Sequence, residues 1–156
     1  MNAAFALAAL VAVAATVMVI TRRNAVHALL YLVVSLLAVA VLMLLLGAAF
    51  VAALEVIIYA GAIMVLFVFV IMMIGADEAT RTPRAWIGPS VLAVVLLAEV
   101  AWVLATGPGL AVTAVEVGPK AIGMALFGPY LLGAEVAAFL LLAGLVGAFH
   151  LGRRRK

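Results

Sequence analysis

Long apolar stretches dominate this chain, and short polar or glycine-containing breaks separate them. A helix needs about 20 apolar residues to cross the ~30 Å hydrocarbon layer of a membrane. Five stretches reach that length, at residues 3–20, 25–46, 50–74, 86–105 and 129–149. The pattern predicts an all-α membrane protein with five transmembrane helices, forming a single integral membrane domain over residues 1–156.

The breaks are short except for the segment from Thr106 to Gly128. Thr21-Arg22-Arg23-Asn24 closes the first stretch, and Gly47 stops the second. Three Gly–Pro pairs punctuate the long segment as turn or helix-boundary signals. Between them, Val112–Val117 is expected to form a short strand or hairpin, and Lys120–Phe127 an interfacial helix of one or two turns.

The basic residues are unevenly divided between the two sides that five crossings create. One side has Arg22, Arg23, Arg81, Arg84 and Arg153–Lys156, which is eight basic residues, and the other has only Lys120. Because basic residues favour the cytoplasmic side, the N-terminus is expected outside and the C-terminus in the cytoplasm. The first stretch has no basic residue before it, so we expect a retained span rather than a cleaved signal peptide.

The composition removes several classes of function. The chain is 71% hydrophobic and 10% charged, which excludes a soluble enzyme. It has no cysteine, so thiolate nucleophiles, thiolate metal sites and iron–sulfur ligands are absent. The net charge of +3 would suggest nucleic acid in a soluble protein, but here it reflects membrane orientation.

Three carboxylates fall within the predicted spans: Glu55, Glu99 and Glu135. At ~1.5 Å per residue, each lies roughly 8–9 Å inside the predicted outer boundary. No Lys, Arg or His lies at that depth, so each acid must be protonated, hydrogen-bonded, or paired with another protein or a water path. Reaching the interface or bonding to a neighbouring helix remains the simpler alternative, mainly for Glu99 and Glu135.

The third predicted helix combines polar and flexible positions. Glu55 and Tyr59 are four residues apart and share one face of a helix. Gly61 follows near the middle of the membrane, after the stiff β-branched run Val56-Ile57-Ile58. This order is compatible with a kink or a π-bulge, but from the residues alone an ordinary packing glycine is the simpler interpretation.

Two histidines, His27 and His150, lie near the cytoplasmic ends of their helices. A pair at similar depth could hold a transmembrane haem, but such ligands need burial in a bundle, and an interfacial position is the simpler interpretation. The basic run Arg153–Lys156 is interpreted as a topology signal and lipid anchor.

Residues 53–74, A-L-E-V-I-I-Y-A-G-A-I-M-V-L-F-V-F-V-I-M-M-I, closely resemble the third helix of the subunit J family of proton-pumping NADH:quinone oxidoreductase, bacterial respiratory complex I. This family is the counterpart of the sixth mitochondrially encoded subunit. Residues 24–32 (N-A-V-H-A-L-L-Y-L), 86–89 (W-I-G-P) and 120–130 (K-A-I-G-M-A-L-F-G-P-Y) agree with it, as does the last helix. The resemblance covers nearly the whole chain.

The resemblance implies a five-helix subunit of the bacterial cell inner membrane, placed in the membrane arm beside subunits H, A, K and N. Members bind no cofactor themselves; NADH, FMN, iron–sulfur clusters and quinone belong to the complex. The chain is therefore expected to be a non-catalytic subunit of a translocase, without activity alone.

The resemblance also suggests roles for residues of the third helix. A π-bulge around Tyr59–Gly61 would interconvert with regular α-helix and open or close a water path for protons. Glu55 and Tyr59 would be polar members of that path and Gly61 its flexible point. Met64, Val65 and Phe67 would form an apolar gate, and Glu99 and Glu135 would be additional intramembrane acids.

Two other functions remain open from the residues alone. One is a structural subunit that supports assembly only. The other is a small stand-alone transporter, against which the absence of inverted-repeat symmetry argues.

Overall fold

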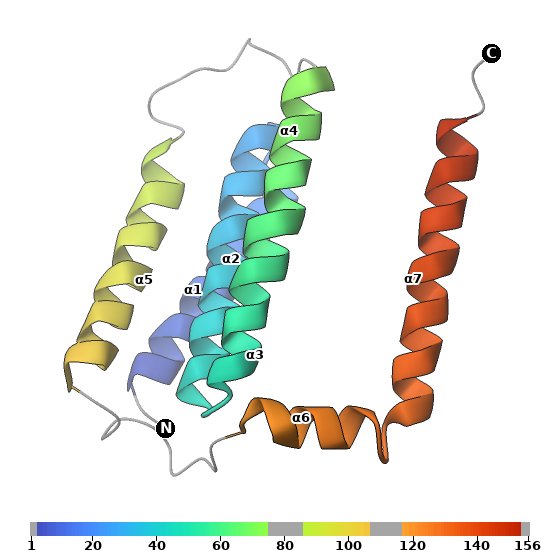
Figure 1. Ribbon diagram of the computed structural model, residues 1–156. Coiled ribbons are helices and arrows are strands. Elements are labelled where there is room, and N and C mark those ends of the chain that lie inside the picture. Colours follow the sequence, from blue (N-terminus) through green and yellow to red (C-terminus); the bar gives the residue numbers. More distant parts are fainter. Residues whose placement is uncertain (1–2, 75–85, 107–116, 154–156) are drawn as a thin grey trace. The chain divides into compact units, whose positions relative to one another are not determined.

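The computed structural model describes residues 3–74, 86–106 and 117–153. Every regular element in these ranges is helical (Figure 1). The elements in chain order are α1 (Ala3–Thr21), α2 (Ala25–Leu45), α3 (Ala49–Leu54), η1 (Glu55–Ile63), α4 (Met64–Ile74), α5 (Ile87–Thr106), α6 (Pro119–Leu126) and α7 (Leu131–Gly152).

The predicted all-α fold with five long apolar helices is confirmed. The helices long and apolar enough to cross a membrane are Ala3–Thr21, Ala25–Leu45, Ala49–Ile74, Ile87–Ala105 and Leu131–Gly152. The third is a continuous helix made of α3, η1 and α4. The helix expected at Lys120–Phe127 is α6, whereas the strand expected at Val112–Val117 lies almost entirely outside the described residues. The orientation of the termini stays a prediction.

Specific side chains and backbone groups fix both ends of α2. At its start, Asn24 Oδ1 accepts hydrogen bonds from the backbone N–H groups of Val26 at 2.9 Å and His27 at 3.3 Å, which is a typical N-cap. At its end, Gly47 has a φ of 81°. There the Gly47 N–H donates to the Leu44 carbonyl and the Ala48 N–H to the Met43 carbonyl, both at 3.0 Å. This Schellman motif turns the chain directly into α3.

The chain packs as two compact units, Met1–Glu116 and Val117–Lys156. The first contains α1 to α5 with η1, and the second contains α6 and α7. In the second unit the turn between the helices is tight, because a Cβ at Gly128 would lie 2.7 Å from the Met124 carbonyl oxygen. The expectation of one domain over residues 1–156 remains a prediction.

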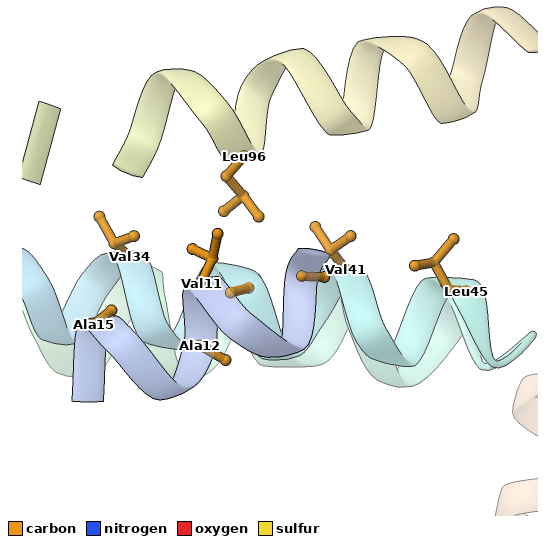
Figure 2. Packing of buried hydrophobic residues seen from close by; sticks show 9 residues of the cluster. Val11, Ala12, Ala15, Val34, Val41, Leu45 and Leu96 are labelled. Atoms are coloured by element: carbon orange, nitrogen blue, oxygen red, sulfur yellow. The ribbon is translucent and has the colours of Figure 1, made fainter. Parts of the chain in front are cut away.

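The core of the first unit lies where α1, α2 and α5 meet. Small side chains on α1 let its backbone approach α2 closely, which is how transmembrane helices gain van der Waals contact. Leu96 of α5 points toward Val11 and Val34 in this core (Figure 2). The buried residues of the cluster are Ala8, Val11, Ala12, Ala15, Val34, Ala38, Val41, Leu45 and Leu96.

A polar contact joins α1 and α2 within this apolar packing. The hydroxyls of Thr16 and Ser35 are 2.8 Å apart and share a hydrogen bond. Both also lie near the carbonyl oxygen of Ala12, to which Thr16 Oγ1 donates at 2.8 Å and Ser35 Oγ at 3.4 Å. The Ala12 carbonyl, one turn before Thr16, is therefore a hydrogen-bond acceptor for hydroxyls of both helices. Because their hydroxyls are hydrogen-bonded, Thr16 and Ser35 can lie within the apolar packing.

Candidate functional site

The third membrane-spanning helix changes its hydrogen-bonding pattern in the middle. The segment η1, Glu55–Ile63, is a π-helix between the α-helical segments α3 and α4. At its end the Met64 N–H bonds to the carbonyls of Gly61 and Tyr59, the second of which is five residues earlier. Because π-helical turns are rare and concentrate at functional sites, this segment is the leading candidate site.

Gly61 lies at the crowded point of the π-helix. A Cβ built there would be 3.1 Å from the carbonyl oxygen of Val56, five residues earlier. That distance is tighter than most real Cβ contacts, so a side chain at position 61 would press on the π-helical backbone. Of the two interpretations that the sequence left open, the structure shows a π-helix. Because Gly61 has no Cβ, it avoids a close contact with the Val56 carbonyl oxygen in this segment.

Glu55 begins the π-helix and Tyr59 lies within it. Glu55 is half-buried, and Tyr59 is 50% exposed. In an α-helix of 3.6 residues per turn, Tyr59 would lie slightly more than one turn after Glu55. A π-helical turn holds more residues, so in η1 Tyr59 lies slightly less than one full turn after Glu55. Both side chains are at least partly exposed in the first unit, and a shared polar strip of carboxyl and phenol stays a prediction.

The three residues of the expected apolar gate do not form one cluster within the chain. Met64 is buried, with 3% of its surface exposed, whereas Val65 and Phe67 are 66% and 51% exposed. Met64 therefore packs inward at the end of η1, and the other two side chains point away from the described core. Any gate that uses Val65 and Phe67 needs a surface from outside the described core of the first unit.

The two further acids differ sharply in their surroundings. Glu99 on α5 is buried, with 6% of its surface exposed, whereas Glu135 on α7 is exposed within its own unit. Within the described residues, neither acid lies in a group of three or more His, Cys, Asp or Glu that could hold a metal ion. His27 is buried in the first turn of α2, and His150 is in the last turn of α7.

An apolar cavity of about 570 Å³ lies beside the start of the π-helix. Every lining residue is apolar, so the cavity offers water no polar side chain to bind. Neither Glu55 nor Tyr59 belongs to the lining, which consists of Val34, Leu37, Ala40, Val41, Leu44, Ala49, Ala52, Ala53, Val56, Ile57, Ala93, Leu96, Leu97 and Val100. The polar side of η1 is therefore distinct from its cavity side.

One structural contact escaped the sequence reasoning. The hydroxyl of Tyr31 on α2 fills the space where a Cβ at Gly88 on α5 would stand. Tyr31 and Gly88 both fall in stretches that carry the family resemblance, N-A-V-H-A-L-L-Y-L and W-I-G-P. That resemblance was the one feature of the sequence that set these two residues apart. Periodicity alone does not pair them, because it does not set the register of α5 against α2.

Comparison with known proteins identifies a matching family model and related sequences. The family model described as NADH-ubiquinone/plastoquinone oxidoreductase chain 6 matches residues 15–151. NADH-quinone oxidoreductase subunit J of Pseudomonas aeruginosa is 54% identical, over 99% of this chain and 98% of that protein. Subunit J of Escherichia coli is 47% identical, over 100% of this chain and 89% of that protein, and subunit J of Rhodobacter capsulatus is 39% identical.

The family match spans most of the chain, including η1, Glu55, Tyr59 and Gly61. The relatives match at high identity over nearly their full length. The chain belongs to the chain 6, or subunit J, family of the NADH-quinone oxidoreductases.

Proposed function

We propose that this chain couples quinone reduction to proton translocation in NADH-quinone oxidoreductase, through a water path gated at η1. It acts in the membrane arm as a multi-pass subunit, next to subunits that correspond to H, A, K and N. The electrons travel through NADH, FMN, iron–sulfur clusters and quinone elsewhere in the complex, and this chain contributes no catalytic group of its own. The observation that carries the proposal is the π-helix at Glu55–Ile63.

Conversion of a π-helical segment to α-helix rotates the residues that follow it about the helix axis. Each i→i+5 turn holds one residue more than an i→i+4 turn. Its loss re-registers the residues that follow by about one position, which is a rotation of roughly 100° about the helix axis. Conversion of η1 would therefore turn the side chains of α4 relative to those of α3. Val65 and Phe67, which now point away from the chain's core, would then face a different neighbour.

The water path runs along the outer face of η1, between this chain and a neighbouring subunit. Tyr59 is half-exposed and Glu55 is half-buried, and a phenol or a carboxyl facing lipid alone would be costly. The cavity on the other side of η1 is wholly apolar and would not hold a chain of water molecules. Glu55 and Tyr59 accordingly carry the path, and Gly61 permits the conversion.

The test is substitution at Gly61 in the intact complex. Gly61→Ala disfavours the π-helix twice: its Cβ presses on the Val56 carbonyl, and alanine stabilises a regular α-helix by about 1 kcal/mol relative to glycine. Gly61→Val adds further bulk against the same carbonyl. We expect both variants to assemble, with the proton uptake of inverted membrane vesicles per NADH oxidised clearly reduced, more so for valine.

Ala62→Val is the matched control, because it adds a β-branched side chain at the next, exposed position of η1. Normal pumping in an assembled Gly61→Val complex would refute the gate. A loss of pumping that only follows the amount of complex in the membrane would instead assign this chain a role in assembly alone.

A further inference from the structure

Glu99 lies where α5 packs against α1, away from the π-helix. Its side chain is 6% exposed, and it faces α1 at the backbone N–H of Ala8, a residue that is itself fully buried. Val100, the next residue of α5, and Leu96, about one turn before Glu99, both line the apolar cavity. Glu99 does not line it. The carboxyl is thus enclosed between helices rather than directed at lipid or at the cavity.

Both carboxyl oxygens of Glu99 lack a hydrogen-bond partner, the only buried side-chain oxygens or nitrogens in the described part of the chain to do so. The Ala8 N–H belongs to the second turn of α1, where the helix's own ladder uses it. By contrast, the buried hydroxyl of Ser35 bonds to Thr16 and to the Ala12 carbonyl. Among the described residues, Glu99 is therefore the one side chain whose buried polar atoms have no hydrogen-bond partner.

Among the described residues of the first unit, no titratable group is placed to balance a charge on Glu99. The helix α1 has no titratable side chain between Ala3 and Thr21. On the antiparallel helix α2, His27 and Tyr31 lie beyond the Thr16–Ser35 bond, toward the opposite end from Ala8. Glu55 is on η1, across the apolar cavity from α5.

Burying an ionised carboxylate without a partner in such a place is far more costly than burying the neutral acid. We propose that Glu99 is a proton-binding site of this chain: it holds a proton as a neutral carboxylic acid between α1 and α5, and releases it only when these helices separate and admit water. The ligand is a proton, and the site does not depend on a gate at η1.

The site couples protonation to helix packing. Closure of α5 on α1 removes water from the carboxyl and favours the protonated form. Separation of the helices hydrates the carboxyl and favours release. A movement of α5 during turnover would therefore take up or release one proton at Glu99, even if η1 stayed rigid.

The test is infrared spectroscopy on the whole purified complex, comparing the native protein with Glu99→Gln. We expect the spectrum of the Glu99→Gln complex to lack one carbonyl band of a protonated carboxyl. Its carboxylate bands should be unchanged. Loss of a carboxylate band would overturn the proposal. The glutamine is a neutral amide of the same shape, so we expect undiminished assembly; a clear drop in assembled Glu99→Gln complex would also contradict a neutral acid at this position.

Transfer to deuterated water tests release. We expect the Glu99 band to shift slowly in the resting complex, and several-fold faster while NADH and quinone are turned over. An equally slow shift with and without turnover would make Glu99 a purely structural acid. Glu135→Gln is the matched control, because Glu135 is exposed in its own unit and its loss should leave the slowly exchanging band in place.

Discussion

The hydroxyl of Tyr31 occupies the space that any side chain at Gly88 would need. This contact joins α2 to the first turn of α5, and only glycine fits at position 88. The Arg22 guanidinium stacks over the same tyrosine ring, with its carbon 5.3 Å from the ring centroid. One buried aromatic side chain thus connects the start of α5 with the end of α1, at the end of the bundle opposite Glu99.

Gly88→Ala should weaken the docking of α5. The new methyl group would overlap the Tyr31 hydroxyl, and overpacking of this kind costs about 1–3 kcal/mol. We expect less assembled complex and a lower temperature of irreversible inactivation. Adding Tyr31→Phe removes the oxygen that clashes, so the double variant should recover much of the loss. If Tyr31→Phe does nothing for Gly88→Ala, the contact does not set the position of α5.

Glu55→Gln should slow turnover without lowering the amount of complex. Glutamine keeps the shape and the hydrogen-bonding capacity of the side chain but cannot carry a proton. We expect a several-fold lower rate of quinone-linked NADH oxidation and proton uptake in membrane vesicles. Glu55→Asp, which keeps a titratable group, should retain more activity than Glu55→Gln. Equal activity of the native and glutamine forms would make Glu55 a structural polar contact.

Apolar run length was enough to predict the helices, because membrane thickness fixes how long each must be. The stop at Gly47 was also readable, since a glycine after an apolar run is the usual residue of a left-handed helix end, and its φ is 81°. The helix at Pro119–Leu126 was predicted from the residues between two Gly–Pro pairs. All of these features depend on local sequence.

Features that depend on contacts between helices could not be predicted in the same way. The residues around Gly61 allowed a packing glycine or a π-bulge, and only the family resemblance favoured the bulge that the structure shows as a longer π-helix. The position of Glu99 along its span could be read from the sequence, but its burial could not, because burial depends on which face α5 turns to α1. The position of Val65 and Phe67 on an open face was likewise outside the reach of periodicity.

The Thr16–Ser35 hydrogen bond should be measurable as a coupling between α1 and α2. Hydrogen bonds between membrane helices contribute about 0.6 kcal/mol on average. We expect Thr16→Val and Ser35→Ala each to lower the inactivation temperature slightly, and the double variant to lower it by less than the sum. Thr21→Val is the control, because Thr21 donates only within α1 in the described contacts, at 2.9 Å to the Val17 carbonyl. Strict additivity would show that the hydroxyls act independently.

Gly47 should tolerate asparagine better than alanine, and valine least of all. Its φ of 81° lies in the left-handed region, which costs roughly 1–2 kcal/mol for ordinary residues but less for asparagine. The same residue sets the angle at which α3 leaves α2, and α3 leads directly into η1. We therefore expect Gly47→Val to reduce the assembled complex and the pumping of what remains, Gly47→Ala to do so less, and Gly47→Asn to stay near the native level. Equal effects of asparagine and valine would show that side-chain volume, rather than backbone conformation, limits this turn.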